Sequence, residues 1–190
     1  MMLGVVLCGG ESKRMGSDKG LLSAGAELWA ERAALKLSKL GIPVVLSVNA
    51  QQLEPYGRVF SAHQLIVDAV EISGPLRGLL SVHKAHPQHD LQVLACDMVD
   101  MDITTLATLK QTYATETAFF DYYVYQKDQF IEPLCAIYPA RTLQSLLTML
   151  ILGTLPSYSL QQLITGSNRL SIPVKNREKF ANYNSNNPFA

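Results

Sequence analysis

The chain has 190 residues, of which 48% are hydrophobic and 17% are charged, so we expect an ordered globular protein rather than a disordered chain. Lysine plus arginine equals aspartate plus glutamate at 16 each, which argues against a surface built for nucleic acid or membranes. The length predicts a single domain over residues 1–190. With no visible secretory signal and with Cys8, Cys96 and Cys135 in apolar runs, we expect a cytoplasmic protein with buried thiols.

Short β-rich runs alternate with helical patterns up to residue 114. Such alternation is typical of right-handed βαβ units, so it predicts an α/β fold with a mainly parallel sheet and helices on both faces. The predicted strands cover residues 3–8, 43–48, 64–68 and 91–96, and the predicted helices cover residues 26–41, 74–86 and 102–114.

The pattern changes in the second half of the chain. Residues 118–138 contain two aromatic and β-branched runs split at residues 126–129, which predicts a hairpin in a mixed C-terminal extension. We expect alternate tyrosines of the first run to lie at the surface. Two further helices and a last strand are predicted at residues 141–153, 159–166 and 169–174.

The segment LCGGESKRMGSDKGLL, residues 7–22, directly follows the first predicted strand. Ligands of open α/β sheets bind beyond the carboxyl ends of strands. Gly9 and Gly10 allow backbone N–H groups to approach an anion, and Arg14 and Lys19 add donors suited to phosphate oxygens. This order of strand, glycines and cations favours a triphosphate site over a solvated surface loop. The spacing fits neither a Walker A loop nor G-x-G-x-x-G.

Two carboxylates follow predicted strands, Asp68 after residues 64–67 and Asp97 after residues 91–96. Aspartates at strand ends project into the ligand crevice of a parallel sheet, where one or two carboxylates suit Mg²⁺. A turn or helix-capping role is the open alternative for each. Asp100 and Asp102 fit the turn and cap roles better.

The segment of residues 7–22 resembles the signature L-A-G-G-x-S-x-R-M-G-x-D-K-x-L-L of molybdenum cofactor guanylyltransferases. These enzymes belong to a nucleotidyltransferase superfamily with a three-layer Rossmann-like fold. Cys8 replaces the usual alanine, and Val99 replaces the proline after Cys-Asp-Met. Later segments resemble the family in the same order, namely VNAQ at 48–51, LIVDAVEISGPLRGLLSV at 65–82, VLACDMVDMD at 93–102, IEPLCAIY at 131–138 and FANYNSNNP at 180–188.

The resemblance implies transfer of GMP from GTP to the terminal phosphate of the molybdopterin cofactor, with Mg²⁺ and release of pyrophosphate. It implies Asp97 as the metal ligand and Arg14, Lys19 and Asp97 as catalytic residues. Nucleotide contacts are expected from Leu7, Cys8, Gly9, Gly10, Lys19, Asn49, Asp68 and Asp97, and acceptor contacts from Pro133, Asn182 and Asn184.

Three other readings stay open at this point. In the resembling family, Gly-Gly after the first strand goes with guanine, yet CTP could serve the same acceptor. A sugar phosphate could replace the acceptor, or the chain could be a non-catalytic nucleotide-binding module. The expected partners are GTP, the molybdopterin cofactor and, transiently, other proteins of cofactor biosynthesis or molybdoenzyme maturation.

Overall fold

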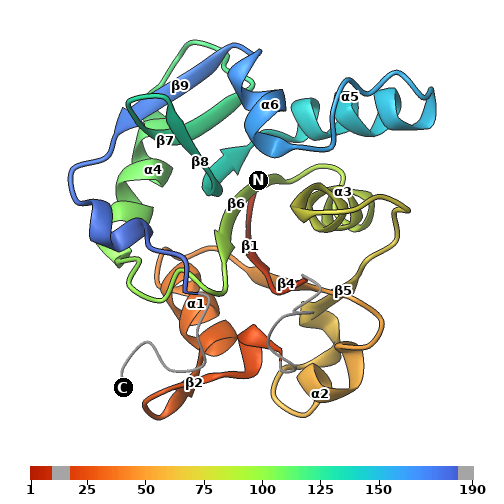
Figure 1. The fold of residues 1–190 in the computed structure, drawn as a ribbon, viewed down its shortest axis with the longest axis vertical. Helices are drawn as coiled ribbons and strands as arrows, with labels where there is room; N and C mark the ends of the chain where they lie inside the picture. Colours follow the sequence, from red (N-terminus) through yellow and green to blue (C-terminus); the bar gives the residue numbers. More distant parts are fainter. Residues whose placement is uncertain (10–17, 184–190) are drawn as a thin grey trace.

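The computed structural model describes residues 1–9 and 18–183, which form one seven-stranded sheet and a two-stranded ribbon (Figure 1). Every strand of the large sheet runs in the same direction except β8, which is antiparallel to both of its neighbours. The predicted mainly parallel α/β fold is therefore confirmed. In spatial order the strands are β5 (Leu65–Val67), β4 (Val44–Val48), β1 (Met2–Leu7), β6 (Asp90–Ala95), β8 (Phe130–Tyr138), β7 (Tyr122–Lys127) and β9 (Arg169–Pro173).

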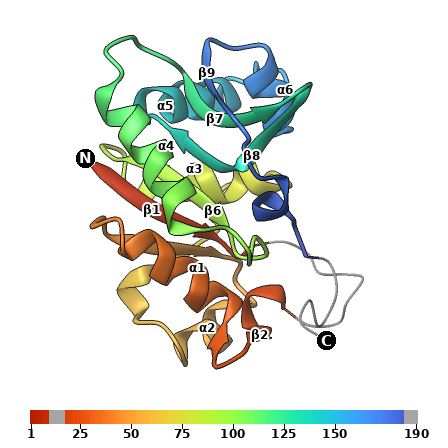
Figure 2. The ribbon, with the colours of Figure 1, turned by 90° about the vertical axis from the view of Figure 1, so that its left-hand side faces the viewer.

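Helices cover both faces of the sheet and make three layers (Figure 2). Side chains alternate along β1, so Leu3 and Val5 join the core on one face while Val6 joins the core on the other. Helices α1 (Trp29–Ser38) and α4 (Ile103–Thr115) pack on the Val6 face. Helices α3 (Pro75–Ala85), α5 (Ala140–Ile151) and α6 (Leu160–Thr165) pack on the opposite face.

The strand order defines where a ligand crevice opens. From β1 the chain adds β4 and then β5 on one side, and β6 lies on the other side of β1. Parallel strands carry their crevice beyond the carboxyl ends at such a switch in direction. The segments that follow β1 and β6, around Gly9 and Asp97, therefore meet at this edge.

The second half of the chain differs from the sequence expectation in one respect. Tyr122, Tyr123 and Tyr125 are all buried, so the prediction of alternate surface tyrosines was wrong. The reason is β9, which pairs in parallel with β7 and makes it an interior strand covered on both faces. The predicted hairpin is confirmed as β7 and β8.

Three remaining features of the described chain are its cysteines, the character of its helices and its short elements. The three cysteines are buried and unbridged, as predicted. No helix in residues 1–9 and 18–183 has the length and apolar character needed to cross a membrane. The short elements are the 3-10 helices η1 (Lys19–Leu21), η2 (Ala62–Gln64) and η3 (Arg177–Phe180), the strands β2 (Ser23–Ala24) and β3 (Glu27–Leu28), and helix α2 (Leu53–Gly57).

Candidate active site

A cavity of about 360 Å³ opens at the carboxyl ends of β1, β4 and β5. Its wall includes Leu7 and Gly9 after β1, Asn49 after β4, and Asp68 after β5. This volume falls within the usual range of small-molecule sites, about 300–1,000 Å³. The structure thus brings together four residues that the sequence assigned to nucleotide binding.

The amino end of α3 forms the remaining wall of this cavity. Gly74 caps the helix with φ +81°, a backbone conformation that favours glycine, and Pro75 occupies the first helical turn. A Cβ on Gly78 would overlap Ser47 Oγ and lie 3.1 Å from Leu7 Cδ2, so glycine lets the helix pack directly on β4 and β1. The positive end of the helix dipole is consequently aimed at the cavity.

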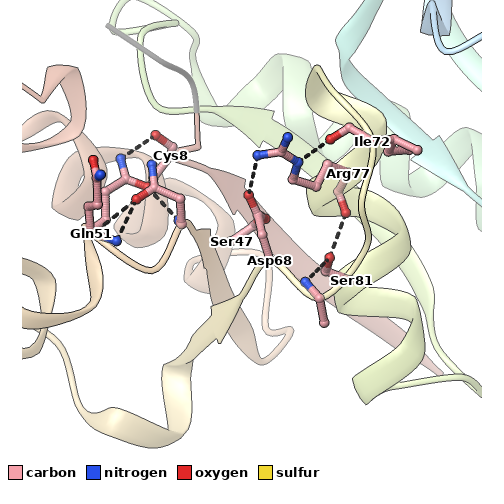
Figure 3. A network of polar contacts seen from close by, with 10 residues as sticks. Cys8, Ser47, Gln51, Asp68, Ile72, Arg77 and Ser81 are labelled. Atoms are coloured by element: carbon pink, nitrogen blue, oxygen red, sulfur yellow. Dashed lines mark hydrogen bonds and ion pairs between the residues drawn. The ribbon is translucent and has the colours of Figure 1, made fainter.

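Asp68 lines this cavity and has two polar partners (Figure 3). Its carboxylate accepts a hydrogen bond from Ser47 Oγ at 3.4 Å and lies 3.9 Å from Arg77 Nη1. Burial raises the pKa of Asp68, while Arg77 and Ser47 oppose that shift. The sequence analysis did not select Arg77. Its position as the third residue of α3, in the segment GPLRG, could have indicated a cation at the crevice.

A second polar cluster holds the two ends of the glycine-rich loop. Gln52 Nε2 donates to the Cys8 carbonyl at 2.9 Å and also to the Asp18 carboxylate. The Tyr56 hydroxyl donates to Asp18 Oδ1 at 2.9 Å. Asn49 Oδ1 accepts from the backbone N–H of Gln52 at 3.0 Å. Local sequence patterns could not predict the bonds to Cys8 and Asp18, because these residues lie more than 30 positions from Gln52 and Tyr56.

Lys19 and Asp97 form a partly buried ion pair beside the cavity. Lys19 Nζ lies 3.1 Å from Asp97 Oδ2, and the two side chains are 23% and 17% exposed. Lys19 belongs to η1, and Asp97 directly follows β6. The backbone N–H of Tyr183 donates to the Asp97 carbonyl at 3.1 Å, so the C-terminal segment also reaches this point.

The donor set around Asp97 suits a metal that arrives with a substrate. Within residues 1–9 and 18–183, no three histidine, cysteine, aspartate or glutamate side chains are grouped to cage an ion. Mg²⁺ commonly takes one or two carboxylates together with phosphate oxygens and water. The partly exposed carboxylate of Asp97 fits that mode of binding.

Two further hollows lie over the start of β8, which neighbours β6 on the side away from β1. One has a volume of about 590 Å³ and is lined by Pro133 and Asn182, both predicted acceptor residues. The other has a volume of about 850 Å³ and extends toward Arg177 and Phe180. Glu132 lines both hollows. The predicted site residues Gly10, Arg14 and Asn184 lie outside the residues that the structure describes.

Glu132 is a buried carboxylic acid that the sequence analysis did not select. Glu132 is 2% exposed. Its Oε1 accepts a hydrogen bond from the backbone N–H of Leu134 at 2.9 Å. Oε2 is buried without a hydrogen-bond partner among the described residues. Burial raises the pKa of Glu132 to about 7, the Leu134 hydrogen bond opposes this, and the Asp97 charge adds to it.

Above pH 7, a Glu132→Gln variant is expected to have a higher free energy of unfolding than the parent protein. Because the folded state favours the protonated acid, folding of the parent loses stability as pH rises from about 4.5 to about 7. The glutamine variant should avoid this loss, which amounts to at most about 3 kcal/mol. Denaturant unfolding at pH 5 and pH 8 measures the difference, and an equal advantage at both values would contradict the prediction.

The fold defined by this sheet is that of the nucleotidyltransferases. Molybdopterin-guanine dinucleotide biosynthesis protein A from Archaeoglobus fulgidus superposes with a TM-score of 0.75 at 21% identity, covering 97% of this chain and 93% of that chain. A nucleotidyl transferase from Methanothermobacter superposes with a TM-score of 0.74 at 15% identity, covering 100% of this chain and 94% of that chain.

The chain belongs to the MobA-like NTP transferase domain family, whose model matches residues 4–167. It is 31% identical to the molybdenum cofactor guanylyltransferase of Xanthomonas euvesicatoria over 96% of this chain and 89% of that protein. It is also 29% identical to a molybdenum cofactor biosynthesis bifunctional protein of Synechocystis sp., covering 75% of this chain but only 40% of that longer protein. The chain is therefore a nucleotidyltransferase, as its sequence predicted.

Proposed function

We propose that this enzyme transfers GMP from GTP to the terminal phosphate of the molybdopterin cofactor and releases pyrophosphate, with Mg²⁺ bound at Asp97. The observation that carries the proposal is the position of Asp97 just after β6, the strand that lies between β1 and β8 in the sheet. The nucleotide-sized cavity lies over β5, β4 and β1, the hollows lie over β8, and β6 with Asp97 separates them in the sheet. The relatives named above support the choice of nucleotide and acceptor.

The reaction needs no covalent enzyme intermediate, because the acceptor phosphate is itself the nucleophile. It attacks the α-phosphorus of GTP, and the bond from that phosphorus to the β-phosphate bridging oxygen breaks. The enzyme therefore contributes mainly orientation and charge neutralisation. Mg²⁺, when bound, supplies positive charge at the α-phosphate. Lys19 supplies a second positive charge beside Asp97 at 3.1 Å, and Gly9 lets backbone approach the nucleotide.

Asp68 is the residue proposed to recognise the guanine base. Guanine presents two adjacent N–H donors, and a carboxylate accepts both in a paired geometry. Cytosine and adenine lack that pair of donors. Burial raises the pKa of Asp68, and Ser47 and Arg77 oppose that rise by favouring its ionised form.

Calorimetric titration with GTP, CTP and ATP, each with and without Mg²⁺, tests the nucleotide assignment. Of the three nucleotides, we expect only GTP to bind, and we expect Mg²⁺ to increase its affinity. An Asp68→Asn variant should bind GTP about tenfold or more weakly, because one charge-assisted acceptor becomes a donor. Glu71→Gln, an exposed carboxylate nearby, serves as the matched control.

A preference for CTP would overturn the guanylyl assignment and favour cytidylyl transfer to the same acceptor. Binding of GTP without pyrophosphate release, when molybdopterin is generated in the same reaction, would favour a non-catalytic module. Pyrophosphate release with a sugar phosphate in place of molybdopterin would redirect the acceptor instead.

A further inference from the structure

We propose that Glu132 recognises the acceptor by accepting hydrogen bonds, through Oε2, from the adjacent N–H donors of its heterocycle, the 2-amino-4-oxopyrimidine edge of a pterin. This inference rests on the proposed function, since it specifies how the acceptor of that reaction is held. It assigns to Glu132 a positioning and specificity role rather than a chemical one.

The geometry of β8 explains why this side chain faces a ligand. Val124 of β7 pairs with Ala136, but Tyr125 pairs with Glu132, so residues 133–135 bulge out of the β7–β8 ladder. The Leu134 N–H within the bulge is bonded to Glu132 Oε1, and the Tyr138 hydroxyl donates to the Pro133 carbonyl at 2.8 Å. The bulge is therefore held open by its own side chains.

A structural role for Glu132 accounts for one of its two oxygens only. The bond from Leu134 needs a single acceptor, which the side-chain carbonyl of a glutamine would provide without a buried charge. Burying a carboxylate without pairing it is costly, and an unsatisfied acceptor retains that cost. Because Oε2 is buried and unpartnered among the described residues, the acid is explained better by a ligand that donates to it.

The surroundings of Glu132 match a flat ring with N–H donors. Phe130, which is 58% exposed, lines both hollows beside Glu132 and offers an aromatic face for stacking. Asp97 contributes negative charge nearby, as its effect on the pKa of Glu132 shows. In the larger hollow the charges of Asp128 and Glu178 are balanced by Lys127 and Arg177, so the preference for a donor-rich edge is assigned to Glu132 and Asp97.

Two pteridines that differ at one position test the proposal. Pterin carries a 2-amino group, whereas lumazine carries an oxygen at that position, so only pterin presents the paired donors. Quenching of their fluorescence by the full-length protein, saturated with GTP and Mg²⁺, gives both affinities. We expect pterin to bind about tenfold or more tightly than lumazine, the scale of a charge-assisted hydrogen bond.

Glu132→Gln keeps the acceptor for Leu134 but places an NH₂ donor at the position of Oε2. This variant should lose the preference for pterin while its GTP affinity, measured by calorimetry, stays within twofold of the parent value. Glu178→Gln, which lies on the larger hollow but is exposed, should keep the preference.

Equal binding of pterin and lumazine to the parent protein, or no binding of either, would overturn the assignment. An unchanged preference in Glu132→Gln would also overturn it. The comparison of the two rings uses the parent protein, so it stands even where a variant folds poorly. Failure of GTP binding would instead count against the proposed function, and the two failures are read in separate titrations.

Discussion

An Asp97→Asn variant is expected to lose nucleotidyl transfer by about a thousandfold or more while keeping its fold and much of its GTP affinity. The nucleotide cavity is lined by residues after β1, β4 and β5 and by α3, so the base contacts do not depend on Asp97. An amide is a far weaker ligand than a carboxylate for a hard divalent ion. Pyrophosphate release at saturating GTP and Mg²⁺, with calorimetry alongside, measures both effects.

Asp90→Asn is the matched control for this experiment. Asp90 begins β6, and Asp97 follows its carboxyl end, so the two aspartates lie at opposite edges of the sheet. Asp90 Oδ1 accepts from the Ala140 N–H at 2.9 Å, a role that asparagine can also fill. Turnover that is equal in Asp97→Asn and the parent protein would remove Asp97 from the proposed mechanism.

A Gly20→Ala variant is expected to lose about 1–3 kcal/mol of unfolding free energy and at least about tenfold in turnover. A Cβ at this position would overlap the Tyr56 hydroxyl and lie 3.1 Å from Cζ of the same ring. Tyr56 is fully buried and bonded to Asp18, so the ring has no room to retreat. Displacing η1 would then move Lys19, the neighbour of Gly20. Denaturant unfolding and steady-state pyrophosphate release measure the two losses.

Two further variants isolate the cause of this effect. Gly57→Ala adds a Cβ that meets nothing within 4 Å, so it should change stability by no more than about 1 kcal/mol. In the double variant Gly20→Ala with Tyr56→Phe, the overlapping hydroxyl is absent, and part of the lost stability should return. If the double variant were as damaged as the sum of the two single variants, the clash would not be the cause.

The longer strands and helices of the first half followed from local patterns, whereas the short elements β2, β3 and α2 were not predicted. The runs at residues 3–8 and 91–96 are apolar because both faces of a parallel sheet are covered, and each lies within a residue of β1 or β6. Local patterns could not reveal that β9 pairs with β7, since the paired residues, such as Tyr122 and Arg169, are 47 positions apart in the sequence. The misplaced tyrosines follow from this one missing contact.

Within the candidate site, residues close to strand ends were predictable, and residues acting across the fold were not. Asp68 and Asp97 are placed by the rule that ligands bind beyond carboxyl ends of strands. Glu132 lies at the start of a reversed strand, where that rule does not apply. Its burial and its unpartnered oxygen depend on a bulge that no periodicity in the sequence records.

The reversed direction of β8 has a consequence for how the acceptor specificity of this scaffold can change. Because β8 is antiparallel, the turn between β7 and β8 lies at the same edge as the ends of β1 and β6, yet belongs to neither. Substitutions or insertions in that turn change no residue of β1, β6 or Asp97. If the hollows over β8 hold the acceptor as proposed, changes in this turn can alter acceptor specificity without changing the residues of the nucleotide cavity.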